Sequence, residues 1–361
     1  MKPRVTVLTT VYNGLPYLSE AIESILNQTY TNFEFLIIDD ASTDASVECI
    51  KSYKDHRIRL VRNENNLGTS GNMNRGLSLI ETPYVVRLDQ DDVSLSKRIE
   101  EQIAYLEKHP DIAIVCSWEQ TIDSNGRKIR DWKRAIRNYG DFLGTVLLGL
   151  CPIWHPSIAF KKEVMIDAGG FNAEYARAED FEVTTRIALK RYDAAIVPRF
   201  HVLQREHNNR QSMLYDNRQA NVARRVHNET VNRFCSHSDA NCLAALLRLE
   251  KDPCGKAYNR KHIKDIMMAL NQLISNVRDK QKINPDEMKS LEDTIYRRVG
   301  FGVRYGAKLT RLPSILFYPT FYSLSPLLIP GVRRTLSGVY SKLQELRYPI
   351  NCFNKLKERN S

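Results

Sequence analysis

Three carboxylates, those of Asp89, Asp91 and Asp92, stand within four consecutive positions directly after the strand-like run Val85–Leu88. Burying so much negative charge is unfavourable unless a cation compensates it. Carboxylates are hard oxygen ligands of the kind that hold Mg²⁺ or Mn²⁺ beside phosphate groups. The cluster therefore indicates a metal–diphosphate site at the carboxyl end of a strand. An alternative stays open, in which the cluster is a solvated acidic turn that caps the next helix, because Asp is a common N-cap residue.

Four strand-like runs in the first part of the chain must position this cluster. They are rich in β-branched and apolar residues, alternate with segments of helical periodicity, and comprise Val5–Val11, Phe33–Ile38, Ile58–Val61 and Val85–Leu88. This alternation predicts an α/β fold with a parallel sheet and right-handed crossovers. Ligands bind such sheets at the carboxyl ends of the strands. Because Asp39-Asp40 ends the second run, both acidic clusters are expected on one edge of the sheet.

Two common phosphate-binding motifs are missing from the sequence. There is no Gly-x-x-x-x-Gly-Lys-Ser/Thr, and no Gly-x-Gly-x-x-Gly follows the first strand-like run. A P-loop ATPase and an ordinary dinucleotide dehydrogenase are therefore disfavoured. Without a basic phosphate cradle, a metal ion has to neutralise the diphosphate.

The pattern of helices and strands continues up to His207. A helix is predicted to open at Glu179-Asp180, and a strand runs up to the Arg205/His207 turn. The other expected elements are helices over 95–107 and 139–150, strands over 112–118, 158–160 and 194–203, and a hairpin turn at Asp123–Gly126.

With these features the sequence resembles the inverting bacterial glycosyltransferases of family 2, which have the GT-A fold. The similarity covers residues 4–212 and rests on five features in order: Val5–Asn13, Asp39–Asp44, Asp89–Asp92, Glu179-Asp180 and the Arg205/His207 turn. A single Asp-x-Asp motif is weak support, but five features in this order are strong. The resemblance implies a mostly parallel sheet flanked by helices, with a helical C-terminal extension.

The resemblance also implies a division of the chain. The GT-A catalytic domain is expected over 1–215, with a nucleotide-binding half at about 1–118 and an acceptor half at about 119–215. A helical, basic region is expected over 216–361.

For the donor, the resemblance assigns roles to residues at the sheet edge. Thr10 and Tyr12 would line the nucleobase pocket, Tyr12 by stacking. Asp40 would read the base, with Asp39 beside it. Arg87 would face the donor sugar or balance the carboxylates. Weaker candidates for contact with the diphosphate are Asn72, Asn74 and Arg75.

For the metal, an Mn²⁺ or Mg²⁺ ion, the resemblance makes Asp91 the principal ligand. Asp89 would contact the ribose or the metal. Asp92 would take part in the site or cap the following helix. His207 would be a further metal ligand or a phosphate contact, and Arg205 an acceptor or site residue of less certain role.

For catalysis, the resemblance places a general base in the Glu179-Asp180 pair, and we choose Asp180. The alternative is that both residues only favour a helix N-terminus. His155 and Trp154 lie in a loop on the acceptor side, where Trp154 would stack on a sugar ring. A hydrogen-bonded structural role for His155 and simple packing of Trp154 stay open.

The implied activity is metal-dependent transfer of a sugar, as a hexosyl or N-acetylhexosaminyl group, from a nucleotide-sugar donor, a UDP-sugar. The acceptor would be a lipid-linked glycan in bacterial surface polysaccharide biosynthesis, such as O-antigen, capsule or exopolysaccharide. One alternative is a sugar-nucleotide nucleotidyltransferase, which usually needs a Gly- and Lys/Arg-rich loop where this chain has Tyr12-Asn13-Gly14. Another is a basic nucleic-acid-binding protein.

The positive charge of the chain is concentrated at its C-terminal end. Residues 280–361 hold 15 Lys or Arg and 6 Asp or Glu, whereas the first 279 residues hold 38 and 36. The 21 residues Leu312–Val332 carry no charge but are interrupted by four prolines. We expect a membrane-associating segment at about 295–340, in contact with anionic lipid. A buried hydrophobic hairpin is the alternative, and no nucleic acid is expected because the aromatic residues lie in the uncharged block.

The expected location is cytoplasmic, on the cytoplasmic face of the inner membrane as a peripheral protein. Seven scattered cysteines without a Cys-x-x-Cys pair suggest reduced thiols. The N-terminus enters a strand-like run without the apolar segment of a signal peptide.

Overall fold

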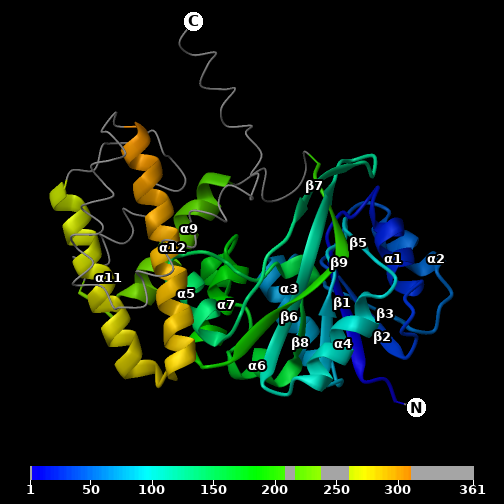
Figure 1. The fold of residues 1–361 in the computed structure, drawn as a ribbon. Coiled ribbons are helices and arrows are strands. Elements are labelled where there is room, and N and C mark those ends of the chain that lie inside the picture. The colour runs from blue at the N-terminus through cyan, green and yellow to red at the C-terminus, as the bar shows by residue number, and fades with distance from the viewer. Residues whose placement is uncertain (1, 208–215, 237–259, 310–361) are drawn as a thin grey trace, which may run out of the picture.

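A computed structural model of the 361-residue chain describes residues 2–207, 216–236 and 260–309 (Figure 1). The strands are β1 (Val5–Val11), β2 (Phe33–Asp39), β3 (Ile58–Arg62), β4 (Tyr84–Arg87), β5 (Val93–Ser94), β6 (Ile112–Ile122), β7 (Lys128–Trp132), β8 (Ala159–Lys161) and β9 (Asp193–Arg205). The helices are α1 (Leu18–Leu26), α2 (Ser46–Ser52), α3 (Gly68–Leu79), α4 (Arg98–Lys108), α5 (Tyr139–Leu147), α6 (Lys162–Asp167), α7 (Glu179–Leu189), α9 (Asp216–Val231), α11 (Arg260–Gln281) and α12 (Pro285–Leu309). Two 3-10 turns are η1 (His155–Ser157) and η2 (Ala173–Tyr175).

The described strands form one sheet in the order β3-β2-β1-β4-β8-β6-β9-β5, with β7 paired to β6. Strands β1 to β4 are mutually parallel, as predicted, and β1 lies between β2 and β4. The strand order therefore reverses at β1, where open α/β sheets bind ligands. Val11 is in register with Asp39 and Leu8 with Arg87, so the loops after β1, β2 and β4 leave the sheet at the same edge.

The other half of the sheet is mixed. Strand β8 is antiparallel to both β4 and β6, β9 is parallel to β6, and the short strand β5 is antiparallel to β9. The predicted turn at Asp123–Gly126 joins β6 to β7 in a hairpin. The predicted fold class, a sheet flanked by helices with a helical C-terminal part, is confirmed, and the antiparallel insertion of β8 is the feature that the sequence did not predict.

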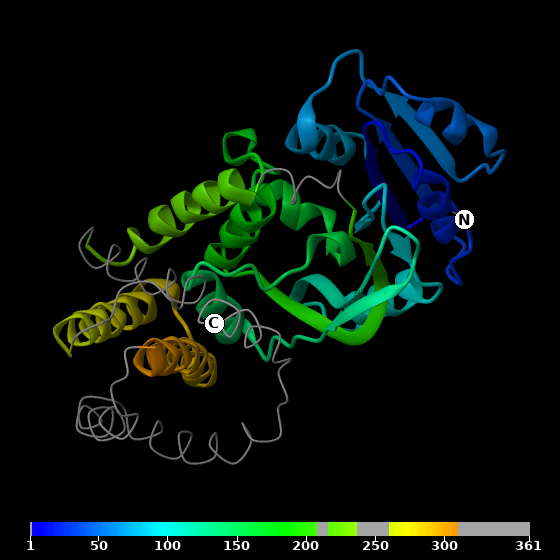
Figure 2. The ribbon, with the colours of Figure 1, turned by 90° about the horizontal axis from the view of Figure 1, so that it is seen from above.

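Helices cover both faces of the sheet, and each face has its own apolar core. One core lies under α1 and α4 and the other under α3, α5 and α7. The second core continues outward through α9, α11 and α12, whose buried residues include Val226, Leu270 and Leu291. Figures 1 and 2 show α11 and α12 on the side of the molecule away from α1 and α2.

Helix α12 packs directly against α5, where two glycines allow the backbones to approach. A Cβ atom at Gly140 would overlap the backbone carbonyl of Glu287, and one at Gly144 would lie 3.2 Å from the carbonyl oxygen of Leu291. Around this contact, Asn138 donates a hydrogen bond to Ser290, and Thr294 donates one to Asp141. The C-terminal helices are thus attached to the sheet-forming part by a close helix–helix contact.

We predict that Gly140→Ala lowers the free energy of unfolding by about 3 kcal/mol, because the new methyl group meets rigid backbone. Gly144→Ala is the matched control: it adds the same methyl group in the same helix with a milder contact, and we expect a change below about 1 kcal/mol. Denaturant unfolding of both variants measures the difference. Equal stability of the two variants would show that α12 does not pack on α5 at Gly140.

None of the helices in the described ranges is long and apolar enough to cross a membrane. Residues 295–309 belong to α12. The rest of the predicted membrane-associating segment, including Leu312–Val332, lies outside the described residues.

Candidate active site

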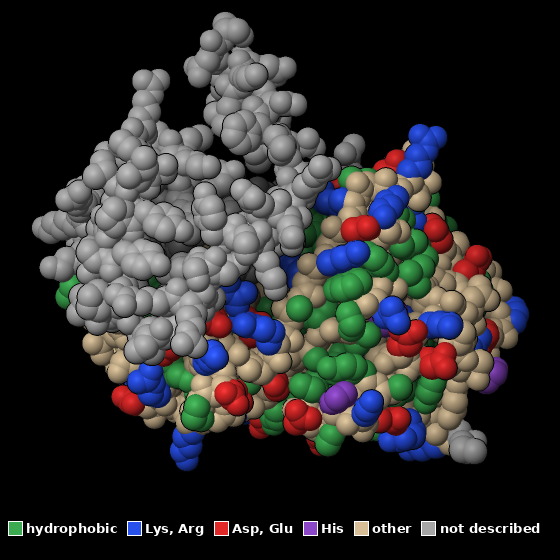
Figure 3. All heavy atoms as spheres, in the orientation of Figure 1, with side chains coloured by type: hydrophobic (Ala, Val, Ile, Leu, Met, Phe, Trp, Pro, Cys, Tyr) green, Lys and Arg blue, Asp and Glu red, His purple; other side chains and the backbone are tan. Residues whose placement is uncertain are grey.

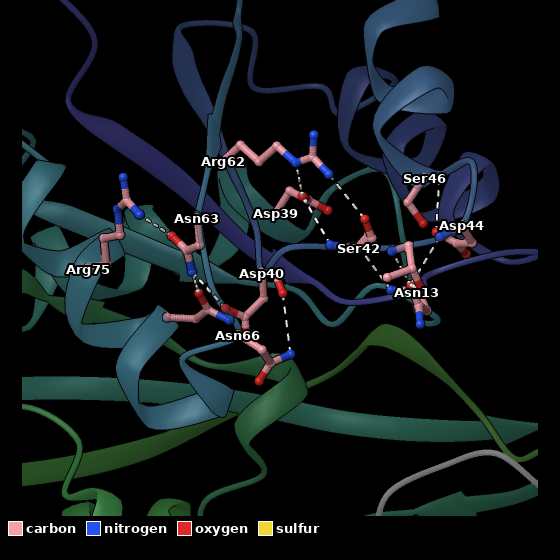
Figure 4. Close-up of polar contacts among 12 residues, drawn as sticks. Asn13, Asp39, Asp40, Ser42, Asp44, Ser46, Arg62, Asn63, Asn66 and Arg75 are labelled. Atoms are coloured by element: carbon pink, nitrogen blue, oxygen red, sulfur yellow. Dashed lines mark hydrogen bonds and ion pairs between the residues drawn. The ribbon is translucent and has the colours of Figure 1, made fainter.

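The turn after β1 is locked to the loop after β2 (Figure 4). Asn13 adopts a positive φ of 50°, and its side-chain oxygen accepts hydrogen bonds from the backbone N–H groups of Thr43, at 2.9 Å, and Asp44, at 3.3 Å. In the opposite direction, Asn13 N–H donates to the hydroxyl of Ser42 and Gly14 N–H to that of Ser46. The two loops therefore form one unit at the edge of the sheet where β1 and β2 end.

Asp39 and Asp40 are both buried but differ in their partners. Asp40 Oδ1 accepts hydrogen bonds from Asn63 Nδ2, at 2.7 Å, and from the backbone N–H of Leu67, at 2.8 Å, and its Oδ2 accepts one from Gly68 N–H. Asp40 thus stabilises the start of α3 and does not present a free oxygen, in contrast to the base-reading role expected for it.

Asp39 has the oxygen that is available to a ligand. Its Oδ2 accepts a hydrogen bond from Ser42 N–H and lies 3.3 Å from Arg62 Nε, whereas its Oδ1 has no hydrogen-bond partner among the described residues. A buried carboxylate oxygen without a partner is unfavourable in the free protein, so a ligand donor at this position would be stabilising. Arg62, the last residue of β3, pairs with this carboxylate and was not predicted from the sequence.

The weaker diphosphate candidates on α3 are engaged elsewhere. The Nδ2 group of Asn63 donates hydrogen bonds to Asn72 Oδ1 and to Asp40 Oδ1. Arg75 in turn donates a hydrogen bond to Asn63 Oδ1. Asn74 bonds both the N–H and the C=O of Phe171, at 2.8 and 2.7 Å, and so holds the loop before α7. These residues position α3 and its neighbours. Asn63 was not predicted as a site residue, although it directly follows β3 and so lies at the carboxyl end of a parallel strand, where such sheets bind ligands.

The acidic loop after β4 brings Asp91 and His207 together. His207 Nε2 lies 2.8 Å from Asp91 Oδ2, and the His207 ring packs against Tyr17 with centroids 5.0 Å apart. Asp89 forms a separate ion pair, with its Oδ1 2.7 Å from a terminal nitrogen of Arg87. The structure thus joins Asp91 to the His predicted to assist it, and joins Asp89 to Arg87.

Gln90, between the two aspartates, fastens this loop to the turn after β1. Its Oε1 accepts a hydrogen bond from Tyr12 N–H at 2.8 Å, and its Nε2 donates to Tyr12 O at 3.2 Å. The Tyr12 side chain is 46% exposed and so is open to a stacking partner. Thr10, near the end of β1 and in register with Ile38 of β2, is partly buried.

Asp92 and Arg205 hold the backbone of the acidic loop from beneath. Asp92 is buried, and its Oδ1 accepts a hydrogen bond from Arg205 N–H at 2.9 Å. Because α4 begins at Arg98, Asp92 does not cap that helix. The buried guanidinium of Arg205 donates to Asp91 O at 3.1 Å, pairs with Glu20, and lies over the Tyr17 ring. Arg205 therefore positions the loop and does not face an acceptor.

The fit of a divalent metal can be tested on these donors. Within the part of the chain that the structure describes, no three or more His, Cys, Asp or Glu side chains converge on one point. A Mg²⁺ or Mn²⁺ ion at a diphosphate needs only one or two protein ligands, because phosphate oxygens and waters supply the others. The Asp91–His207 pair fits that requirement, and Asp89 is close in sequence but bonded to Arg87.

Asp180 lies in the first turn of α7, and its Oδ1 accepts a hydrogen bond from Phe181 N–H at 2.7 Å. Burial, together with the charge of Glu179, raises the pKa of Asp180 to about 6, while Arg87 acts in the opposite direction. Glu179 Oε2 is buried and has no hydrogen-bond partner among the described residues. A carboxylate with a pKa near neutrality is suited to general base catalysis.

Arg87 interacts with carboxylates from two parts of the chain, the acidic loop after β4 and the start of α7. Burial alone would lower the pKa of Arg87, but the charges of Asp89, Asp180 and Glu179 outweigh it and raise that pKa above its usual value. One guanidinium is therefore surrounded by carboxylates from the loop after β4 and from the start of α7.

His155 is buried beneath the start of α7. Its Nε2 lies 3.3 Å from Thr184 Oγ1, and its ring meets Phe171 edge-on. Burial and the nearby charge of Arg87 lower the pKa of His155 well below its ordinary value, so the ring is neutral. His155 supports α7, and the neighbouring Trp154 stacks with Trp132, with centroids 6.5 Å apart.

Comparison with known proteins shows to which family this chain belongs. The family described as glycosyl transferase family 2 matches residues 6–167. An uncharacterized glycosyltransferase of Methanocaldococcus jannaschii is 32% identical over 203 residues, which are 55% of this chain and 69% of that relative. The chain belongs to glycosyltransferase family 2. A second relative, an uncharacterized glycosyltransferase of Haemophilus influenzae, is 30% identical over 247 residues, which are 64% of this chain and 74% of that protein.

The fold of this family 2 glycosyltransferase is also found among solved structures. The crystal structure of S. aureus TarS 1–349 in complex with UDP-GlcNAc superposes with a TM-score of 0.54 and 15% identity, covering 85% of this chain and 92% of that chain. The GT-A fold and the membership in family 2 expected from the sequence are therefore confirmed. The roles of the individual site residues stay predictions.

Proposed function

We propose that this family 2 glycosyltransferase moves a sugar from a UDP-sugar to a glycan acceptor with inversion at the anomeric carbon. The observation that carries the proposal is the position of Arg87, which pairs with Asp89 at 2.7 Å and interacts with Glu179 and Asp180. Donor and catalytic carboxylates thus meet around one cation at the switch point of the sheet. The likeness to a structure that contains UDP-GlcNAc supports a uridine nucleotide.

In the proposed reaction, Asp180 accepts the proton of the acceptor hydroxyl. The acceptor oxygen forms a bond to the anomeric carbon while the bond from that carbon to the phosphate oxygen breaks, and the nucleoside diphosphate leaves. Asp91 and His207 would hold a divalent cation, which supplies Lewis-acid stabilisation of the departing diphosphate when bound. Arg87 keeps the carboxylates charged and apart, and Asp39 Oδ1 receives a donor group of the base.

We further propose that the acceptor is lipid-linked and that the enzyme works on surface polysaccharide at the cytoplasmic face of a membrane. Support comes from the excess of Lys and Arg in residues 280–361, since basic segments are attracted to anionic lipid.

The test is a set of UDP-, GDP- and dTDP-sugars incubated with a pool of lipid-linked oligosaccharides and read by mass spectrometry. We expect one UDP-sugar to add a single sugar mass. A nucleotidyltransferase would instead release pyrophosphate from a nucleoside triphosphate and a sugar phosphate. Tight binding of oligonucleotides without binding of any nucleoside diphosphate would refute the proposal.

The activity is expected to depend on the ionisation of Asp180. A base with a pKa of about 6 is mostly protonated at pH 5 and mostly ionised at pH 7, so kcat/KM should rise about tenfold between these values. Glu179→Gln removes a negative neighbour, which lowers the pKa of Asp180 and moves the rise in kcat/KM to lower pH. A pH–rate profile of the wild type and of the variant measures the position of this rise. A rise at the same pH in both enzymes would exclude Asp180 as the titrating base.

Asp39 and Asp40 should respond differently to substitution by asparagine. Asp40→Asn disturbs three hydrogen bonds at the start of α3, and we expect a loss of about 2 kcal/mol in the free energy of unfolding. Asp39→Asn should change stability by less than about 1 kcal/mol, because its partner Arg62 is 58% exposed, but weaken nucleotide binding about tenfold. Denaturant unfolding measures the stability of both variants, and calorimetric titration measures their affinity for the nucleotide. The reverse pattern would return the base-reading role to Asp40.

A further inference from the structure

The hairpin arm β7 and the residues after it carry an exposed basic and aromatic strip that the proposed function has not used. Residues 127–137 contain six Lys or Arg and one acidic residue. Figure 3 shows Lys and Arg side chains over the β6–β7 hairpin. Arg130 and Trp132 are two residues apart in β7 and so lie on one face of that strand, and Arg134 follows shortly after the strand ends at Trp132.

Arg134 lies against two indole rings. Its guanidinium carbon is 5.6 Å from the centre of the Trp132 ring and 5.5 Å from that of Trp154, and the rings are tilted by only 26° to each other. The guanidinium carbon of Arg130 also lies 5.5 Å from the centre of the Trp132 ring. The Trp132 side chain is 38% exposed. We call these four residues, Arg130, Trp132, Arg134 and Trp154, the hairpin platform.

The platform is connected to both sides of the reaction centre. At one end, Arg130 pairs with Glu206, the neighbour of His207. At the other end, Trp154 precedes His155, and Arg134 donates a hydrogen bond to Cys151 O at 3.2 Å. Burial, and after it the charge of Asp180, raises the pKa of the Cys151 thiol. The platform therefore runs beside the edge where the metal-side pair and the proposed base lie.

Lys133, the neighbour of Arg134 in the chain, provides a comparison within the same segment. Lys133 lies 5.1 Å from the centre of the Trp118 ring and 5.5 Å from that of Phe200. Trp118 donates its indole N–H to Arg134 O. Lys133 thus has the same kind of cation–ring contact as its neighbour Arg134, but its rings are Trp118 and Phe200 and not those of the platform.

We propose that the hairpin platform binds the acceptor, and that the acceptor is a sugar with an anionic group next to it. The inference rests on the proposed function and names the substrate class of that site. A flat indole buries the apolar face of a sugar ring. A guanidinium binds a phosphate or a carboxylate through two parallel hydrogen bonds. Lys133 and Arg134 have no ion pair with a carboxylate in the described ranges, so Arg134 needs to break none to bind such a group.

The experiment uses the full chain and three simple probes, which are N-acetylglucosamine 1-phosphate, methyl glucuronide and the neutral methyl N-acetylglucosaminide. Tryptophan fluorescence in the presence of UDP gives the affinity for each probe. We expect at least one anionic probe to bind about tenfold more tightly than the neutral one. Preference for the phosphate identifies a phosphate-linked acceptor, and preference for the carboxylate an acidic sugar.

Arg134→Gln should remove this preference, and the matched control Lys133→Gln should keep it. Trp132→Ala should lower the affinity for all three probes about tenfold, whereas Trp132→Phe, which keeps an aromatic face, should lower it less. Equal binding of neutral and anionic probes, no binding of either anionic probe, or equal losses in the two charge variants would overturn the proposal.

Calorimetric titration with UDP separates this inference from the proposed function. UDP affinity should be the same in the wild type, Arg134→Gln and Lys133→Gln. A fall confined to Arg134→Gln would show that the residue acts on the donor and would overturn the platform. If the wild type does not bind UDP at all, the proposed function fails, while the preference for anionic probes still reports on the platform.

Discussion

Replacing Asp180 with asparagine is expected to lower kcat about a thousandfold and to leave nucleoside diphosphate affinity nearly unchanged. Asparagine keeps the side-chain oxygen that accepts the hydrogen bond from Phe181 N–H, so the start of α7 should keep its geometry. It cannot accept the acceptor proton, because the amide is not basic. Single-turnover transfer and calorimetric binding, measured on the same preparation, separate the two effects.

Asp193→Asn is a matched control for this prediction. Asp193 Oδ1 also accepts a hydrogen bond from the next backbone N–H, at 2.7 Å, and burial likewise raises the pKa of Asp193 to about 6. It stands at the start of β9, in register with the start of β6, at the other end of the strand from Arg205. We expect normal turnover. Equal losses in the two variants, or full activity of Asp180→Asn, would assign the base to another residue.

Replacing Asp91 with alanine is expected to lower kcat/KM by more than about a hundredfold and to abolish stimulation by Mn²⁺. The loop should survive the change, because Arg205 holds it through Asp91 O and through the Asp92 side chain. The loss would therefore report on the carboxylate and not on the backbone. Transfer rates across a Mn²⁺ titration measure it.

His207→Ala serves as the graded comparison for Asp91. If His207 assists the same ion, its removal should raise the Mn²⁺ concentration for half-maximal activity about tenfold. Transfer by Asp91→Ala that still rises with Mn²⁺ would move the metal to another donor set. Thermal unfolding of both variants should match the wild type within a few degrees, which excludes a general loss of fold.

The first four strands were predictable because their signal is local. Parallel strands covered on both faces are rich in β-branched and apolar residues, and β1 and β2, with the sequences VTVLTTV and FEFLIID, have this composition. The remaining sheet order was not predictable from such patterns. It depends on the three-residue strand β8 inserting antiparallel between β4 and β6, and on the pairing of Ile112 with Asp193 across a long stretch of chain.

The edge of the sheet that holds the site could be predicted, but the tasks of the residues on it could not. Asp39 and Asp40 end the same strand, and the sequence gives no reason to separate them. Their difference arises from the left-handed backbone at Ala41, with φ of 60°, and from Asn63 and the start of α3. The family resemblance made Arg205 a candidate site residue, and only its burial and its contacts with the acidic loop show that it supports that loop.

The most direct test of the central claim is calorimetric titration of the wild-type enzyme with UDP, GDP and dTDP, each with and without Mn²⁺. We expect UDP to bind, and we expect Mn²⁺ to increase the affinity for UDP by at least about tenfold. Failure of all three nucleoside diphosphates to bind, with and without Mn²⁺, would contradict the assignment of this edge of the sheet as a nucleotide-sugar site.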